Sequence, residues 1–170
     1  MTSEHARVMA RYNRWMNDKL YAVAAKLTDA ERKQDRGAFF GSIHRTLNHL
    51  LVADRIWLAR LTGATLSDGE LGPGRIRAID QELYENFEEL RRERAKTDDD
   101  LDAFVATLTD EKLAGSLRYL RLGVPTELPL WHVVAHVFNH QTHHRGQVTT
   151  LLSQAGHDPG VTDLFAMLRA

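Results

Sequence analysis

The 170-residue sequence contains nine histidines and no cysteine, and five of the histidines lie within thirteen residues. These five are His132, His136, His140, His143 and His144. Imidazole nitrogens bind zinc and other transition metals. The absence of cysteine excludes disulfides, iron–sulfur clusters, thiolate zinc sites and a cysteine nucleophile within this chain. Any metal site formed here must therefore use nitrogen and oxygen ligands.

Four of the clustered histidines are spaced by four residues, which places them along one side of a helix. Each step of four turns by about 40° around the helix axis, so only neighbouring pairs can share one ion. Measured from the centre of the apolar stripe of this segment, His144 lies about 40° away and His140 about 80° away. We expect these two to face the protein interior. We expect His136 to lie at the border of the stripe, and His132 and His143 to lie outside it.

A pair of histidines at positions i and i+4 has Cβ atoms roughly 6 Å apart, so both rings can reach one cation. Two histidines alone make a weak site, and a third ligand must come from elsewhere in the chain. The main candidates are His44 and His49 on an earlier helix. Periodicity leaves this choice open, because His44 lies closer to the main apolar stripe of that helix and His49 lies on a second side that could also be buried.

Four long helical segments are expected to position these residues. Their apolar side chains recur at steps of three and four residues. The predicted segments are about Ser3–Leu27, Ala38–Leu61, Ile76–Leu108 and Leu130–Ala155.

Turn-forming residues separate these segments. Thr28 and Asp29 suit a turn or the cap of a short following turn, and Thr62–Arg75 is predicted to be a loop because of its glycines and Pro73. The run Thr97–Asp100 could break the third segment. A short hairpin or extended segment around Gly123 is expected before the last long helix, and the tail after Gly156 could add one further turn.

Together these elements predict an all-α fold, a four-helix bundle forming one domain over residues 1–170. The composition, 43% hydrophobic and 26% charged, is that of an ordinary globular protein. The net charge of −1 gives no reason to expect a nucleic-acid or membrane partner. We expect a cytoplasmic location, since the sequence lacks a signal-peptide pattern and an apolar run of roughly 18 residues.

The segment from His136 to Val148, which reads HVFNHQTHHRGQV and is followed by LLSQAG, resembles the signature of the DinB/YfiT-like family of metalloenzymes. Two further blocks resemble that family: Tyr12-Asn13-Arg14-Trp15, and Thr46 to Leu50 with Ala53-Asp54. The resemblance extends over nearly the whole chain. It implies a four-helix bundle, in agreement with the prediction from periodicity. It also implies a homodimer, because members of that family often form homodimers.

The resemblance also implies a metal site with one histidine from the second helix and two from the fourth. Carried over by position, these are His49, His140 and His144. Three neutral histidines leave coordination positions open for water or substrate, as in catalytic sites. Zinc or nickel suits such ligands best, with iron or manganese as further candidates.

Several neighbouring polar residues are candidates for orienting the imidazoles or for binding substrate near them. They are Asn48, Asp54, His136, Arg145 and Gln147. For Asp54 a structural ion pair is the competing interpretation. For Arg145, whose position lies on the core side, pairing with a buried carboxylate competes with binding an anionic substrate.

The function implied by the resemblance is that of a metal-dependent enzyme acting on a small molecule, as a thiol S-transferase or as a hydrolase. A transferred thiol must be an external low-molecular-weight thiol, because the chain has no cysteine. The alternative is a non-catalytic protein that binds a metal or small ligand, such as a sensor or stress-response module.

Overall fold

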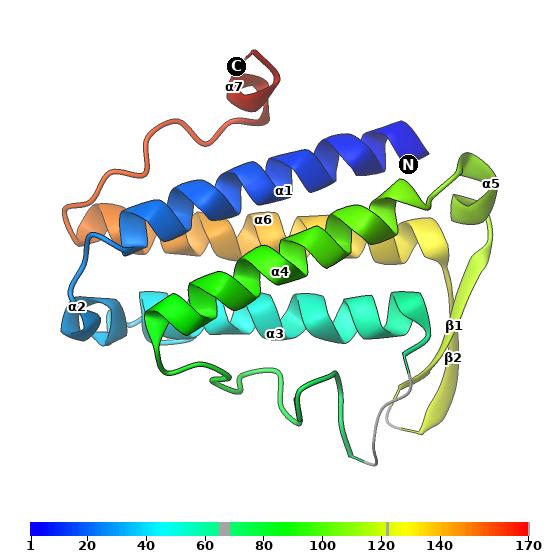
Figure 1. The fold of residues 1–170 in the computed structure, drawn as a ribbon, viewed down its shortest axis with the longest axis horizontal. Helices are drawn as coiled ribbons and strands as arrows, with labels where there is room; N and C mark the ends of the chain where they lie inside the picture. The colour runs from blue at the N-terminus through cyan, green and yellow to red at the C-terminus, as the bar shows by residue number, and fades with distance from the viewer. Residues whose placement is uncertain (65–68, 122, 170) are drawn as a thin grey trace.

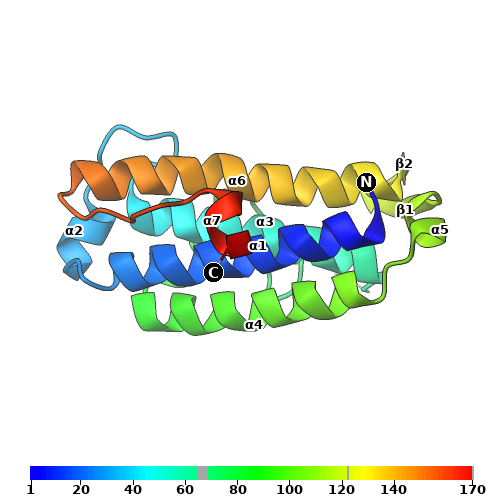
Figure 2. The same cartoon turned by 90° about the horizontal axis from the view of Figure 1, so that it is seen from above.

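Helices make up most of the computed structural model, which describes residues 1–64, 69–121 and 123–169 (Figure 1). Four long helices lie side by side, and α1 and α3 each contact both α4 and α6 (Figures 1 and 2). Their bounds are α1 Ser3–Ala24, α3 Ile43–Thr62, α4 Phe87–Ala106 and α6 Leu130–Gln154. Three short helices accompany them: α2 Asp29–Lys33, α5 Asp110–Leu113 and α7 Leu164–Arg169.

Capping residues mark the ends of several of these helices. Thr2 and Ser42 accept backbone N–H groups of the first turns of α1 and α3. Thr28 forms a capping box with Glu31 at the start of α2, which confirms the predicted cap. At the end of α3, Gly63 has a φ of 67°, a left-handed conformation that glycine adopts without strain.

Apolar side chains from all four long helices form the core. One cluster contains a nearly inaccessible leucine from each helix, namely Leu20, Leu47, Leu90 and Leu152. Burial of each of these side chains contributes about 1.5–3 kcal/mol. The second cluster, which includes Phe138, extends the core between the same helices. These contacts hold α3 and α6 at a fixed separation, which the candidate site requires.

The third helix is shorter than predicted, because α4 begins at Phe87 and not near Ile76. Asn86 caps it by accepting the backbone N–H of Glu89. The preceding residues are held across α3: Ile76 is buried against Ile56, and Asn48 Oδ1 accepts the N–H groups of Leu83 and Tyr84 at 3.0 Å each. These contacts use backbone groups that a helix would need for itself, so the segment stays irregular, with a turn in which Gln81 N–H donates to the carbonyl of Ala78.

The predicted break at Thr97–Asp100 is wrong, since α4 continues through it. Thr97 Oγ1 donates to the carbonyl of Glu93 in the preceding turn at 2.9 Å. Asp98 pairs with Arg94 at 2.9 Å, one turn away. Both polar side chains therefore bond in ways that are compatible with the helix.

The other boundaries agree with the prediction more closely. The first helix ends at Ala24, three residues early, and the second begins at Ile43, where Ser42 caps it, and not at Ala38. The fourth helix ends at Gln154, before Gly156 with its φ of 82°. Helix α7 provides the extra turn expected in the tail. Part of the predicted loop Thr62–Arg75, residues 65–68, lies outside the described residues, as do Leu122 and Ala170.

The predicted hairpin is present as two antiparallel strands, β1 Ser116–Arg121 and β2 Val124–Pro129. It lies at one end of the long helices (Figure 1), where both strands contact α6. Both strands are edges, which accommodates the two prolines of β2. Among the described helices, none is both long and apolar enough to cross a bilayer.

Candidate metal centre

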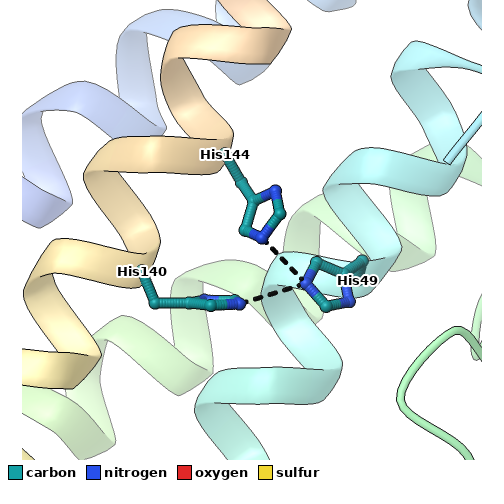
Figure 3. A group of neighbouring side chains, drawn as sticks. All are labelled: His49, His140 and His144. Carbon is teal, nitrogen blue, oxygen red and sulfur yellow. Dashed lines mark hydrogen bonds between the residues drawn. The ribbon is translucent and has the colours of Figure 1, made fainter. Parts of the chain in front are cut away.

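Three histidine side chains from two long helices meet between α3 and α6. His49 Nε2 lies 3.1 Å from His140 Nε2 and 3.2 Å from His144 Nε2 (Figure 3). The ligand atoms of all three residues lie within 4.8 Å of one another. The i,i+4 spacing places two of the rings on adjacent turns of α6, and His49 projects toward them from α3 (Figure 3).

The hydrogen bonds of the opposite ring nitrogens determine which atoms face the centre. His49 Nδ1 lies 2.9 Å from the carbonyl oxygen of Ile79, and His144 Nδ1 lies 2.7 Å from Gln147 Oε1. Both partners are oxygen acceptors, so each Nδ1 carries the proton and donates it. In the neutral rings, the Nε2 atoms of His49 and His144 therefore present lone pairs to each other.

Two lone pairs 3.2 Å apart repel unless a cation lies between them. Imidazole nitrogens bound to zinc at about 2.0–2.1 Å with tetrahedral angles are about 3.3 Å apart, close to the separations here. The donor set is three nitrogens, with oxygen acceptors behind two of the rings, as is typical of metal-binding histidines. The group thus fits a divalent transition-metal ion.

Burial keeps these rings neutral, which metal binding requires. It lowers the pKa of His140 to about 3, with smaller contributions from His144 and His49. Burial also lowers the pKa of His49 and of His144. The ring of Phe40 stacks on His49 with centroids 3.9 Å apart and helps to remove that ring from water.

The structure separates the histidines that periodicity left as alternatives. His44 Nε2 lies 2.9 Å from the carbonyl oxygen of Tyr84 and 3.3 Å from Glu82, outside the three-histidine group. His49 is therefore the histidine of α3 that lies with the pair on α6. His132 and His143 are exposed, as predicted for residues outside the apolar stripe, and His136 is exposed and packs on Trp57 with centroids 5.1 Å apart.

Of the five polar candidates, Gln147 is the one that bonds a ring of the group within the described residues. Asn48 instead holds the chain at Leu83 and Tyr84. Asp54 forms the competing structural ion pair, with Arg94 at 2.8 Å, and both residues are almost inaccessible.

Among the described residues, Arg145 forms no direct ion pair with a carboxylate. Nor does it line the pocket beside His140. Its guanidinium donates to the side-chain oxygen of Asn13 and lies over the ring of Tyr12, at 5.4 Å from the centroid. The side chain is 2% exposed, and burial lowers its pKa to about 10. Asn13 in turn donates to Asp98, so an amide links the buried arginine to a buried carboxylate.

Two contributors to the centre were not predicted. The Ile79 carbonyl is a backbone group, and no residue type signals it. Phe40 lies in a turn before α3, whereas the sequence predicts that it belongs to the helix itself. Next to the centre, a pocket of about 640 Å³ extends from His140 toward the hairpin.

Comparison with known proteins identifies the family of this chain. A family model described as the DinB family matches residues 1–170. The protein named "Protein DinB" of Bacillus subtilis (strain 168) is 26% identical over 171 residues, which cover 95% of this chain and 92% of that protein. A solved structure of a DinB-like protein from Bacillus cereus ATCC 10987 has a TM-score of 0.62 at 23% identity. That alignment covers 87% of this chain and 91% of the other, and it shows a shared fold.

Proposed function

The chain belongs to the DinB family, and from this membership and the three-histidine cluster we propose that it is a metal-dependent enzyme acting on a small molecule. His49, His140 and His144 would hold one divalent ion, zinc or nickel in preference to iron or manganese. The convergence of the His49 and His144 lone pairs at 3.2 Å is the observation that carries the proposal. The packing of α1, α3, α4 and α6 supports the associated expectation of a four-helix bundle.

The chain's own residues define what the site can do. A divalent ion bound there supplies Lewis acidity, which lowers the pKa of a water or thiol group that binds it. The Ile79 carbonyl accepts a hydrogen bond from His49 Nδ1, and Gln147 Oε1 accepts one from His144 Nδ1. Both bonds keep the imidazole proton on Nδ1 and leave Nε2 free to bind the ion. The three rings are neutral and leave ligand positions open, an arrangement typical of catalytic and not of closed structural sites.

Two reaction classes fit this arrangement, thiol S-transfer and hydrolysis of a small substrate. In the first, the thiol is external, because the 170 residues include no cysteine. The second candidate function is a non-catalytic metal or small-ligand sensor. It is favoured by the lack of an acidic side chain in the adjacent pocket among the described residues, since no carboxylate is there to act as a general base.

Metal analysis of the full chain, purified without chelator, tests the site. We expect about one divalent ion per chain, and loss of most of it in His144→Ala. The matched control is His132→Ala, which removes an exposed histidine from the same helix. Equal metal content in the native protein and His144→Ala would show that the assignment is wrong.

Turnover distinguishes the enzyme from the sensor. The metal-loaded protein is mixed with 2-mercaptoethanol and 1-chloro-2,4-dinitrobenzene for the transferase, and with 4-nitrophenyl acetate for the hydrolase. Turnover that is lost in His49→Ala supports the enzyme. Binding of the thiol without turnover in either assay supports the sensor.

A further inference from the structure

Two arginines line the pocket next to His140. Arg60 comes from the last turns of α3 and Arg121 from the end of β1. Within the described ranges, no aspartate or glutamate lines this pocket. Apolar side chains such as Ile56 and Leu128 form much of the remaining wall. The pocket therefore combines an apolar surface with two positive charges.

The local structure directs both arginines to this side of the molecule. On α3, His49, Ala53, Trp57 and Arg60 follow one another at steps of three and four residues, so they share one side of the helix. On β1, Tyr119 and Arg121 share a face, because side chains alternate along a strand. Arg118 lies on the other face, where it pairs with Glu127 at 3.0 Å.

Neither arginine is neutralised by the part of the protein that the structure describes. Arg14, Arg55 and Arg94 each have a carboxylate within 3.0 Å. Within residues 1–64, 69–121 and 123–169, no such partner within 4.0 Å is found for Arg60 or Arg121. Their guanidinium N–H groups are left to bind a ligand.

Aromatic rings hold Arg60 in place without neutralising it. Its guanidinium carbon lies 4.6 Å from the ring centroid of Trp57 and 4.9 Å from that of Tyr119. Burial lowers the pKa of Arg60, and the nearby charge of Arg121 lowers it further, whereas Tyr119 raises it. An anion placed between the two guanidinium groups would relieve this repulsion.

The same pocket leads from the arginines to the candidate metal centre. The ring of Trp57 contacts His136, which lies 5.8 Å from His140 between ring centroids. Along α3, Arg60 follows His49 by eleven residues, a rise of about 16 Å. An elongated ligand can therefore place one end near the arginines and the other near His140.

We propose that this pocket binds a small organic anion, with its charged group at Arg60 and Arg121 and its apolar body along Trp57. A reaction of the other end of the ligand, beside His140, rests on the proposed function. The anion-binding part does not, because it depends on residues outside the three-histidine group.

A pair of probes that differ only in charge tests the inference in metal-free protein. The probes are 4-phenylbutanoate and neutral 4-phenylbutanamide, and their affinities are measured by calorimetry with the full chain. We expect the carboxylate to bind about tenfold more tightly, since charge-assisted hydrogen bonds replace neutral ones. Both probes should shift the NMR signal of the Trp57 indole N–H.

Charge-matched double variants locate the effect. In Arg60→Gln/Arg121→Gln, the preference for the carboxylate should fall to within about twofold. Arg45→Gln/Arg118→Gln changes the net charge equally at exposed positions outside the pocket and should keep the preference. The single variant Arg121→Gln, at an exposed position of the hairpin, retains the fold and should lose part of the preference.

Equal affinity for the two probes in native protein would overturn the inference. So would a preference that survives in Arg60→Gln/Arg121→Gln. Because no metal is present, these outcomes are independent of the metal content of His144→Ala. The failure of one proposal is therefore distinguishable from the failure of the other.

Discussion

Replacing Gln147 by leucine tests whether the orientation of His144 controls metal affinity. Gln147 Oε1 accepts the Nδ1 proton of His144 at 2.7 Å, and this bond directs the Nε2 lone pair toward His49. Leucine has a similar size and cannot accept a hydrogen bond. The unbonded ring is then free to rotate or to change tautomer, and either change removes one nitrogen from the site.

The structure sets the size of the expected effect. Loss of an acceptor behind a metal-binding histidine lowers affinity by about 10–100-fold. Gln147 is half-buried, so water can partly replace its oxygen, whereas His144 itself is only 8% exposed. We therefore expect the lower end of this range, a tenfold loss or about 1.4 kcal/mol.

Competition with a chromophoric chelator measures this affinity directly. Gln147→Glu preserves the oxygen acceptor and should bind zinc at least as tightly as the native protein. Gln154→Leu makes the same substitution at an exposed position of α6 and should have no effect. The reasoning would be refuted by native affinity in Gln147→Leu, or by equal losses in the leucine and glutamate variants.

Three further results are expected. The unfolding free energy of chelator-treated, metal-free protein should be about 2.7 kcal/mol lower than that of protein in free zinc at one hundred times Kd, as measured by urea titration. The unfolding free energy of His144→Ala should be the same in both conditions. Arg94→Met should destabilise the fold by about 3–5 kcal/mol, because it leaves two buried carboxylates unpaired, and a loss below 1 kcal/mol in the same titration would contradict this. Burial lowers the pKa of His44, so its contribution to stability is complete above its unfolded pKa of about 6.5 and is lost as the pH falls below that value. His44→Gln should make stability less dependent on pH between about 6.5 and 5 in denaturant titrations, and an unchanged dependence would exclude this origin.

The sequence predicted the part of the centre that lies on one helix. The spacing of His140 and His144 and the direction of the apolar stripe on α6 were sufficient to pair them, because both histidines lie on one regular element. The choice between His44 and His49 could not be made in this way, since both are buried on α3. The family resemblance identified His49 as the third candidate, and the structure places it beside His140 and His144.

The chain before α4 could not be predicted from periodicity. Residues 76–86 are rich in charged and helix-forming types, yet they form no helix because Asn48 and the apolar side chains of α3 bind them. These are contacts between residues twenty or more positions apart, and local propensity does not report them. For the same reason, the Ile79 carbonyl could not be identified as a partner of His49.

Ile79 belongs to two sites at once. Its carbonyl oxygen accepts the proton of His49 Nδ1, and the same residue lines the pocket that contains Arg60 and Arg121. A molecule that displaces Ile79 on entering the pocket alters the basicity and orientation of His49. If the proposed ion and such a molecule both bind, their affinities are thermodynamically coupled, and each must change the other by the same factor.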